Sequence, residues 1–192
     1  MESGKVKRWL LISILTTFAI FSCSSPGCGS TTTVGPGSTP SIAPRVGALA
    51  PDFTLPSLDG EVVKLDEMRG QPVLVNFWGT WCTYCRRQMP YLQAAFEEKG
   101  QEVKFIAIDV GEGSGTVRRY VDDTGIGFTV ALDMSRAVAS AYNIRYYPTT
   151  FFVDEQGVIK YIKLGAFGST SELMAVLEAL SETRARDLSS RT

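Results

Sequence analysis

The chain has 192 residues, 19 Lys and Arg against 20 Asp and Glu, and a formal net charge of −1. With charges this balanced and no basic stripe interleaved with aromatic residues, nucleic-acid binding has no electrostatic support. The sequence contains no histidine, which excludes a Cys–His nucleophile pair, a His-ligated metal and a histidine pH switch. We therefore predict one domain after a leader and a linker, with no metal, no cofactor and no nucleic-acid partner.

Residues 1–22 have the pattern of an export signal. Three basic residues precede an apolar run over residues 9–21, which is too short for a mature membrane-spanning helix but fits the core of a secretory signal. Ser22-Cys23 then resembles a bacterial lipoprotein signal, in which the Cys is acylated. Residues 1–22 are predicted to be a signal peptide or a membrane anchor. Acylation at Cys23, cleavage nearby and an uncleaved anchor all place the domain outside the cytoplasmic membrane.

The following segment, residues 23–47, is rich in Ser, Gly, Pro and Thr. Such a composition cannot bury enough apolar surface to fold, so it predicts a flexible tether of roughly 25–30 Å. The folded domain is expected over residues 48–182, and a frayed polar tail over residues 183–192.

Apolar runs bounded by turn residues predict the elements of that domain. In chain order we expect a hairpin of residues 50–55 and 62–65, a helical turn at 66–70, a strand at 73–78, a helix to residue 99, a strand at 103–110, a helix at 116–124, a strand at 128–132, a helical turn at 135–142 capped by Ser135, strands at 149–153 and 158–164, and a helix at 169–180 capped by Ser169. This order predicts an α/β sheet with helices on both faces, its early strands parallel and its last hairpin antiparallel.

The Cys82-Thr83-Tyr84-Cys85 segment directly follows the buried strand and opens the next helix. Unpaired N–H groups and a partial positive charge at a helix N-terminus favour a thiolate, and they can lower the pKa of such a thiol from ~8.5 into the ~3.5–7.5 range. Cys85 lies one turn further on the same helix face. A disulfide closing four residues would constrain little, and zinc would need two more ligands. The spacing therefore predicts a redox pair, with Cys82 attacking and Cys85 resolving.

Given these motifs, the chain resembles the thioredoxin superfamily, and specifically the ResA/TlpA-like membrane-tethered thiol–disulfide oxidoreductases, over about residues 46–180. The resemblance rests on the segments at residues 50–53, 76–82, 85–86, 89–90 and 147–151. It implies a thioredoxin-like fold, with a central mixed sheet flanked by helices and an added N-terminal β-hairpin. It also implies a cis peptide bond before Pro148, and a helix that continues through Pro90 with a kink.

The same resemblance suggests which residues shape the site and bind substrate: Trp81, Thr83, Tyr84, Gln88, Tyr147 and Pro148. Three positions depart from the pattern. Tyr84 stands where Pro is common, Asn76 where thioredoxin has a buried Asp, and Gln88 where many ResA-like proteins have Glu. No obvious carboxylate proton acceptor is therefore expected beside Cys85.

By resemblance, the protein would reduce disulfides of exported proteins at the outer face of the cytoplasmic membrane of a bacterium. Electrons would come from a membrane dithiol donor protein, and apocytochrome c would be the leading substrate. One alternative is a peroxiredoxin-like peroxidase, because residues 50–55 also open those proteins, although the Pro they need upstream of the Cys is missing. Another is a tethered, non-catalytic binding module.

Overall fold

The computed structural model of the protein describes residues 41–189, with the side chains of residues 183, 184 and 186–189 left out. The predicted leader, the acylation site Cys23 and the tether up to residue 40 lie outside the described residues. Within the described part of the chain, every helix is too short or too polar to cross a membrane.

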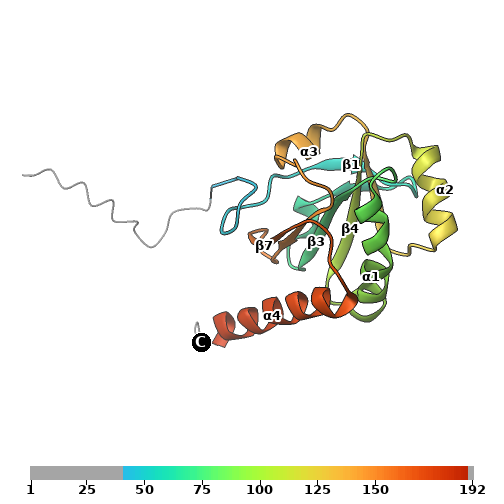
Figure 1. Ribbon diagram of the computed structural model, residues 1–192. Coiled ribbons are helices and arrows are strands. Elements are labelled where there is room, and N and C mark those ends of the chain that lie inside the picture. The colour runs from blue at the N-terminus through green and yellow to red at the C-terminus, as the bar shows by residue number, and fades with distance from the viewer. Residues whose placement is uncertain (1–40, 190–192) are drawn as a thin grey trace, which may run out of the picture. The chain divides into compact units, whose positions relative to one another are not determined.

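The central sheet has five strands in the order β5-β4-β3-β6-β7 (Figure 1). Their bounds are Val73–Trp78 for β3, Lys104–Val110 for β4, Thr129–Asp133 for β5, Thr149–Val153 for β6 and Ile159–Leu164 for β7. β3, β4 and β5 run parallel, whereas β6 is antiparallel to β3 and β7 is antiparallel to β6. This mixed sheet confirms the predicted α/β fold class.

Helices and a small hairpin cover the two faces of the sheet (Figure 1). Residues of α1, α2 and α4 pack in one core cluster, and residues of α3 and the hairpin pack in the other. The bounds are Thr54–Pro56 for β1, Val62–Lys64 for β2, Asp66–Met68 for the 3-10 helix η1, Thr83–Lys99 for α1, Ser114–Thr124 for α2, Ala137–Ala141 for α3 and Thr170–Ser189 for α4. β1 and β2 form the added antiparallel hairpin.

β3 is the strand that delivers the chain to the cysteines, and all six of its residues are buried. Leu74 and Trp78 pack in the cluster that contains α1, whereas Val75 and Phe77 pack in the cluster on the opposite face. Such two-sided burial explains why the strand is a continuous apolar run. Its one polar residue, Asn76, donates from Nδ2 to the Thr150 hydroxyl of β6 at 2.8 Å.

The folded part begins earlier than residue 48, the predicted start of the domain. Within residues 41–47, the N–H of Gly47 donates to the carbonyl of Ile159 at 2.8 Å, and the N–H of Ala43 donates to that of Leu49 at 3.0 Å. Residues 41–47 therefore do not belong to the predicted tether, and the rest of that segment lies outside the described residues. The composition of residues 41–47 indicated disorder, but backbone bonds to β7 hold them irrespective of side-chain type.

Two predicted helix boundaries are wrong. α4 begins as predicted, with the Ser169 hydroxyl accepting the N–H of Glu172 at 3.1 Å, but it continues to Ser189 instead of ending at Leu180. No Gly or Pro follows Leu180 to stop it, so the helix outlasts its apolar face. At α3, the N-cap residue is Arg136, without a side-chain cap bond, and not Ser135. The Ser135 hydroxyl accepts the N–H of Ala137 at 3.4 Å, and the carboxylate of Asp133 accepts the N–H of Ala139 at 2.8 Å.

Candidate active site

Cys82 is the N-cap residue of α1, in extended backbone conformation. Its Sγ accepts the backbone N–H of Cys85 at 3.1 Å, so one unpaired donor of the helix terminus points directly at the sulfur. The prediction that Cys82 opens the helix is confirmed. In the reduced protein the same N–H and the helix dipole favour a thiolate at this position.

Cys82 and Cys85 are joined by a disulfide, with their Cα atoms 5.2 Å apart. Cys82 keeps 7% of its surface exposed, whereas Cys85 keeps none. The two sulfurs therefore differ in access: an incoming disulfide can reach Cys82 from solvent, but Cys85 is reached only through Cys82.

Aromatic side chains surround Cys82. Trp81 is 53% exposed and Tyr84 is 63% exposed, and the Trp81 ring contacts that of Tyr147 with centroids 5.0 Å apart. The Tyr147–Pro148 peptide bond is cis, as the resemblance implied. Thr83, the first residue of α1, is exposed. The structure thus brings Trp81 and Tyr147 together beside the cysteines.

Large exposed hydrophobic side chains lie at one edge of the sheet. Trp81 and Tyr84 follow β3, Met134 follows β5, and Tyr146 precedes β6, which is antiparallel to both. All four therefore lie at the carboxyl edge of the parallel strands.

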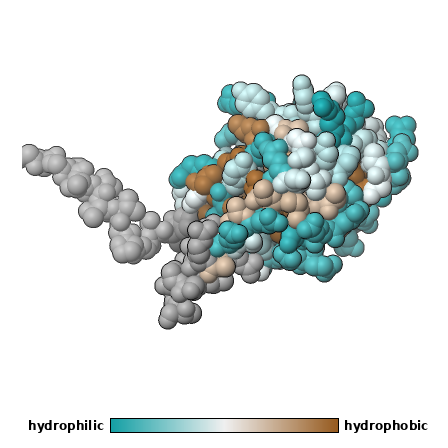
Figure 2. Space-filling view, turned by 60° about the horizontal axis from the view of Figure 1, so that its bottom comes forward, coloured by the Kyte–Doolittle hydropathy of each residue, from teal (hydrophilic) through white to brown (hydrophobic). Residues whose placement is uncertain are grey.

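The face shown in Figure 2 is mostly hydrophilic, with a band of more hydrophobic residues across it. On the edge strand β7, the exposed apolar residues are Tyr161 and Leu164.

Gln88 is fully buried on α1, one turn beyond Cys85. Its Oε1 accepts the backbone N–H of Phe167, in the loop between β7 and α4, at 3.1 Å. Its Nε2 has no hydrogen-bond partner among the described residues. Gln88 therefore cannot contact a substrate at the surface. It can influence the site only through the buried residues around it.

Two acidic residues near the cysteine turn were not anticipated. Glu112 follows β4, and its carboxylate accepts both the N–H of Thr80 at 2.6 Å and the hydroxyl of Thr80 at 2.7 Å. Asp109, near the end of β4, is fully buried and accepts the N–H of Glu112 at 3.2 Å. The sequence could have pointed to them by their position at the end of β4 and just after it. β4 is the parallel strand beside β3, and the carboxyl ends of neighbouring parallel strands meet at one edge of the sheet.

Charge and burial act on the ionisable groups at this edge. Burial raises the pKa of Asp109 to about 8, and the hydrogen bond and the charge of Glu112 add to the rise. Burial also raises the pKa of the Tyr147 phenol, an effect that Arg136 opposes. Asp109 and Tyr147 are therefore both protonated at pH 7.

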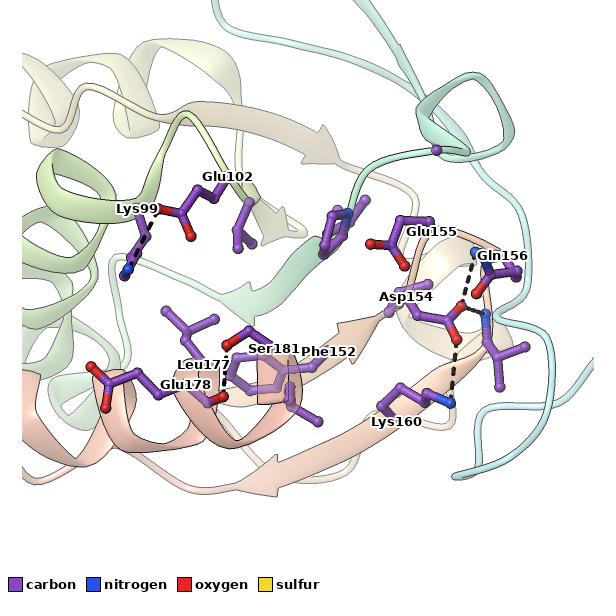
Figure 3. Close-up of a pocket in the computed structure, with 17 residues that line it drawn as sticks. Lys99, Glu102, Phe152, Asp154, Glu155, Gln156, Lys160, Leu177, Glu178 and Ser181 are labelled. Carbon is purple, nitrogen blue, oxygen red and sulfur yellow. Dashed lines mark hydrogen bonds and ion pairs between the residues drawn. The ribbon is translucent and has the colours of Figure 1, made fainter. Parts of the chain in front are cut away.

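A cavity of about 640 Å³ lies at the other end of the sheet (Figure 3). It is lined by the start of β3 at Val73, by the β6–β7 turn and by α4, and the ion pairs Lys99–Glu102 and Lys160–Asp154 flank it. Because β3 rises about 3.3 Å per residue, its start and its end are roughly 16 Å apart. No residue of the predicted site lines this cavity.

Known proteins share both the sequence and the fold. The profile of the AhpC/TSA family matches residues 46–162. The chain is 40% identical over 128 residues to the thiol-disulfide oxidoreductase ResA of Geobacillus kaustophilus, covering 66% of this chain and 74% of that protein. ResA of Bacillus subtilis is 35% identical over 120 residues, or 62% of this chain and 67% of that protein.

Among solved structures, a candidate thiol:disulfide interchange protein DsbE of Chlorobium tepidum superposes with a TM-score of 0.60. It is 29% identical, and the match covers 74% of this chain and 96% of that one. The family match over residues 46–162 contains the Cys82–Cys85 disulfide and the cis-Pro148 loop. The chain therefore belongs to the AhpC/TSA family, as a thioredoxin-like thiol–disulfide oxidoreductase with a C-x-x-C pair.

Proposed function

We propose that this protein is tethered at the outer face of the cytoplasmic membrane of a bacterium and reduces disulfides of exported proteins there. The observation that carries the proposal is the asymmetry of the pair. Cys82 caps α1 and keeps 7% of its surface exposed, whereas Cys85 has no exposed surface. That arrangement suits a dithiol with one attacking and one resolving sulfur.

In the proposed cycle, the Cys82 thiolate attacks one sulfur of a substrate disulfide. A mixed disulfide forms, and the substrate's other sulfur leaves as a thiolate that takes a proton from water. Cys85 then gives up its proton and attacks Cys82 Sγ, so the Cys82–Cys85 disulfide forms and the second substrate thiol is released. Two electrons pass to the substrate. A dithiol donor protein at the membrane restores the reduced pair by the reverse exchange.

The surface around Cys82 supports a protein substrate. Trp81, Tyr84, Met134 and Tyr146 expose large apolar groups at one edge of the sheet, and aromatic side chains supply rigid contact area at small entropic cost. An unfolded segment that carries a disulfide can lie across such a surface. By the resemblance to the ResA/TlpA-like oxidoreductases, apocytochrome c is the leading substrate.

The sequence before the domain supports the location. A short apolar segment with basic residues ahead of it precedes Ser22-Cys23, a pattern of export with acylation at Cys23. Mass spectrometry of the mature N-terminus tests this part. We expect an acylated Cys23 as the first residue; an unmodified residue further along the chain would contradict the lipid anchor.

The reaction itself is tested by two assays on the same purified protein. Reduction of insulin disulfides in the presence of a dithiol is expected, and it should be lost in Cys82→Ser. Consumption of hydrogen peroxide is expected to stay at background. Peroxide turnover without insulin reduction would favour a peroxidase, and neither activity would favour a binding module.

A further inference from the structure

Asp109 is a buried acidic residue, and one of its carboxyl oxygens, Oδ2, accepts no hydrogen bond from the described residues. The residue pairs with Trp78 across the parallel β3–β4 ladder and has no exposed surface. Its Oδ1 accepts the N–H of Glu112 at 3.2 Å. Among the described residues, no N–H or hydroxyl group donates to its Oδ2. Such an oxygen is costly to bury as part of a carboxylate.

The Glu112 carboxyl is close enough to Asp109 to act on it: the Glu112 N–H donates to Asp109 Oδ1, and Glu112 contributes to the raised pKa of Asp109. Two carboxylates can only accept hydrogen bonds, and neighbouring carboxylates repel one another. A hydrogen bond between them therefore requires one shared proton. Because Glu112 already accepts two bonds from Thr80, the proton belongs on the buried Asp109, which lacks other donors.

Glu112 ties this buried acid to the cysteine turn. Its carboxylate holds Thr80 by both the N–H and the hydroxyl. Thr80 lies inside the turn that Cys82 closes by donating its N–H to the carbonyl of Gly79 at 3.1 Å. Gly79 has no room for a side chain, because the Trp81 indole lies against it. The position of Glu112 therefore fixes the turn that presents Cys82.

We propose that Asp109 is a positioning residue for the Cys82–Cys85 pair, because it donates a proton to Glu112 and so fixes the Thr80 turn. Three donors then converge on the Glu112 carboxylate, two from Thr80 and one from Asp109. When Asp109 loses its proton, that third bond becomes a repulsion between two neighbouring charges, of which Asp109 is fully buried and Glu112 is partly buried. The turn loosens, and the added negative charge disfavours the thiolate-bearing, reduced form of the cysteine pair.

Electrostatics set the pH at which this happens. Burial is the largest of the influences that raise the pKa of Asp109 from 3.8 to about 8. The Glu112 carboxyl and the charge of Asp133 raise this pKa further, whereas the hydrogen bond from the Glu112 N–H lowers it. On the neighbouring elements, the Tyr147 phenol senses the charges of Arg136, Asp133 and Asp109, and the Arg136 guanidinium lies beside Gly111, two residues after Asp109. Asp109 therefore keeps its proton below about pH 8 and loses it above.

The test is the equilibrium of the cysteine pair with glutathione, measured at pH 6 and pH 9 for wild type and Asp109→Asn. The amide of Asn has the same shape and donates an N–H at every pH. At pH 6 we expect equal equilibrium constants. At pH 9 the constant for oxidation of the wild-type pair should exceed that of the variant by about two- to tenfold, the effect of one lost hydrogen bond. If the ratio of the wild-type constant to the Asp109→Asn constant is the same at pH 6 and pH 9, the proposal is overturned.

Two further variants sharpen the test. Asp123→Asn makes the same chemical change on the exposed face of α2. Its equilibrium constant with glutathione should equal that of wild type at both pH values. Thr80→Val removes a donor to Glu112 at nearly constant volume, so it should change the constant at both pH values. An unchanged constant in Thr80→Val would show that Glu112 does not act through the turn.

The shared proton can also be observed in the wild-type protein alone. The infrared band of a protonated carboxylic acid is expected at pH 6, should disappear between pH 7 and 9, and should be absent from Asp109→Asn. If wild type and the variant show the same spectrum in that region at pH 6, Asp109 holds no proton and the proposal fails.

Discussion

Gln88→Glu places a carboxyl group under the cysteine pair, at the position where many ResA-like proteins carry Glu. The native amide has no exposed surface and accepts one bond, from the N–H of Phe167 at 3.1 Å. The variant keeps that acceptor, and its second oxygen replaces Nε2, a donor that has no acceptor among the described residues. Burial therefore dominates, and the pKa of the introduced carboxyl rises.

The size of the effect follows from this environment. Full burial raises a carboxyl pKa by up to 3–5 units, and one N–H donor offsets part of that, which leaves a rise of about 2–3 units. At 1.36 kcal/mol per unit, the folded protein loses about 3–4 kcal/mol of stability once the group is ionised. The loss is absent below about pH 4, where both folded and unfolded chains bind the proton, and it grows as the pH rises to about 7.

The introduced charge also acts on the cysteines, because like charges disfavour ionisation. The alkylation profile of the reduced pair should move up by about one pH unit if the groups lie within ~6 Å of one another. The two thiols titrate as a coupled unit, so the whole profile from pH 5 to pH 10 is compared. Urea unfolding of the oxidised protein at pH 4.5 and pH 8 measures the stability loss.

Gln101→Glu is the matched control, since it adds the same charge at an exposed position beyond α1. It should leave both the alkylation profile and the pH dependence of unfolding unchanged. If Gln88→Glu also leaves the alkylation profile in place, and if its cost in unfolding free energy is the same at both pH values, position 88 does not tune this site and the reasoning is refuted.

Three further predictions concern the cysteines, the core and the buried acid. Cys85→Ser should accumulate mixed disulfides with substrate proteins on non-reducing gels while Cys82→Ser traps few, and equal trapping would contradict their assigned roles. Thr150→Val leaves the buried amide of Asn76 without its 2.8 Å acceptor and should lower the unfolding free energy by about 1–3 kcal/mol, whereas an unchanged urea midpoint would show that this bond is dispensable. Because the pKa of Asp109 is raised to about 8, wild-type stability should fall as the pH rises from about 4 to 8; Asp109→Asn should remove that slope in urea unfolding, and an unaltered slope would contradict the assignment.

Local patterns were sufficient to predict the elements that carry the chemistry. The run at residues 73–78 is apolar on both faces because β3 is central to the sheet. A strand followed by a short break and a helix places Cys82 at a helix start, and the structure confirms it as the N-cap. The prediction of a cis bond before Pro148 came from the resemblance, because only about 5% of X–Pro bonds in folded proteins are cis.

Contacts between distant segments could not be predicted in the same way. Gln88 was expected on α1 beyond Cys85, but only the fold shows that Phe167, 79 residues later, supplies its partner. Glu112 stands between β4 and α2, outside the predicted elements, yet its bonds to Thr80 span 32 residues. Likewise Asp133, at the end of β5, accepts the N–H of Ala139 in α3 at 2.8 Å, a shorter bond than the 3.4 Å one from Ala137 to the nearer Ser135, because β5 ends beside the start of that helix.

The reduction potential of the Cys82–Cys85 couple tests the proposed role most directly. It is measured by equilibrating the protein with glutathione buffers at pH 7 and quantifying the dithiol by alkylation. A reductant of exported proteins predicts a low potential, near the ~−270 mV of thioredoxin. A value near ~−120 mV, as in the strong oxidant DsbA, would mean that the protein donates disulfides and would contradict the account.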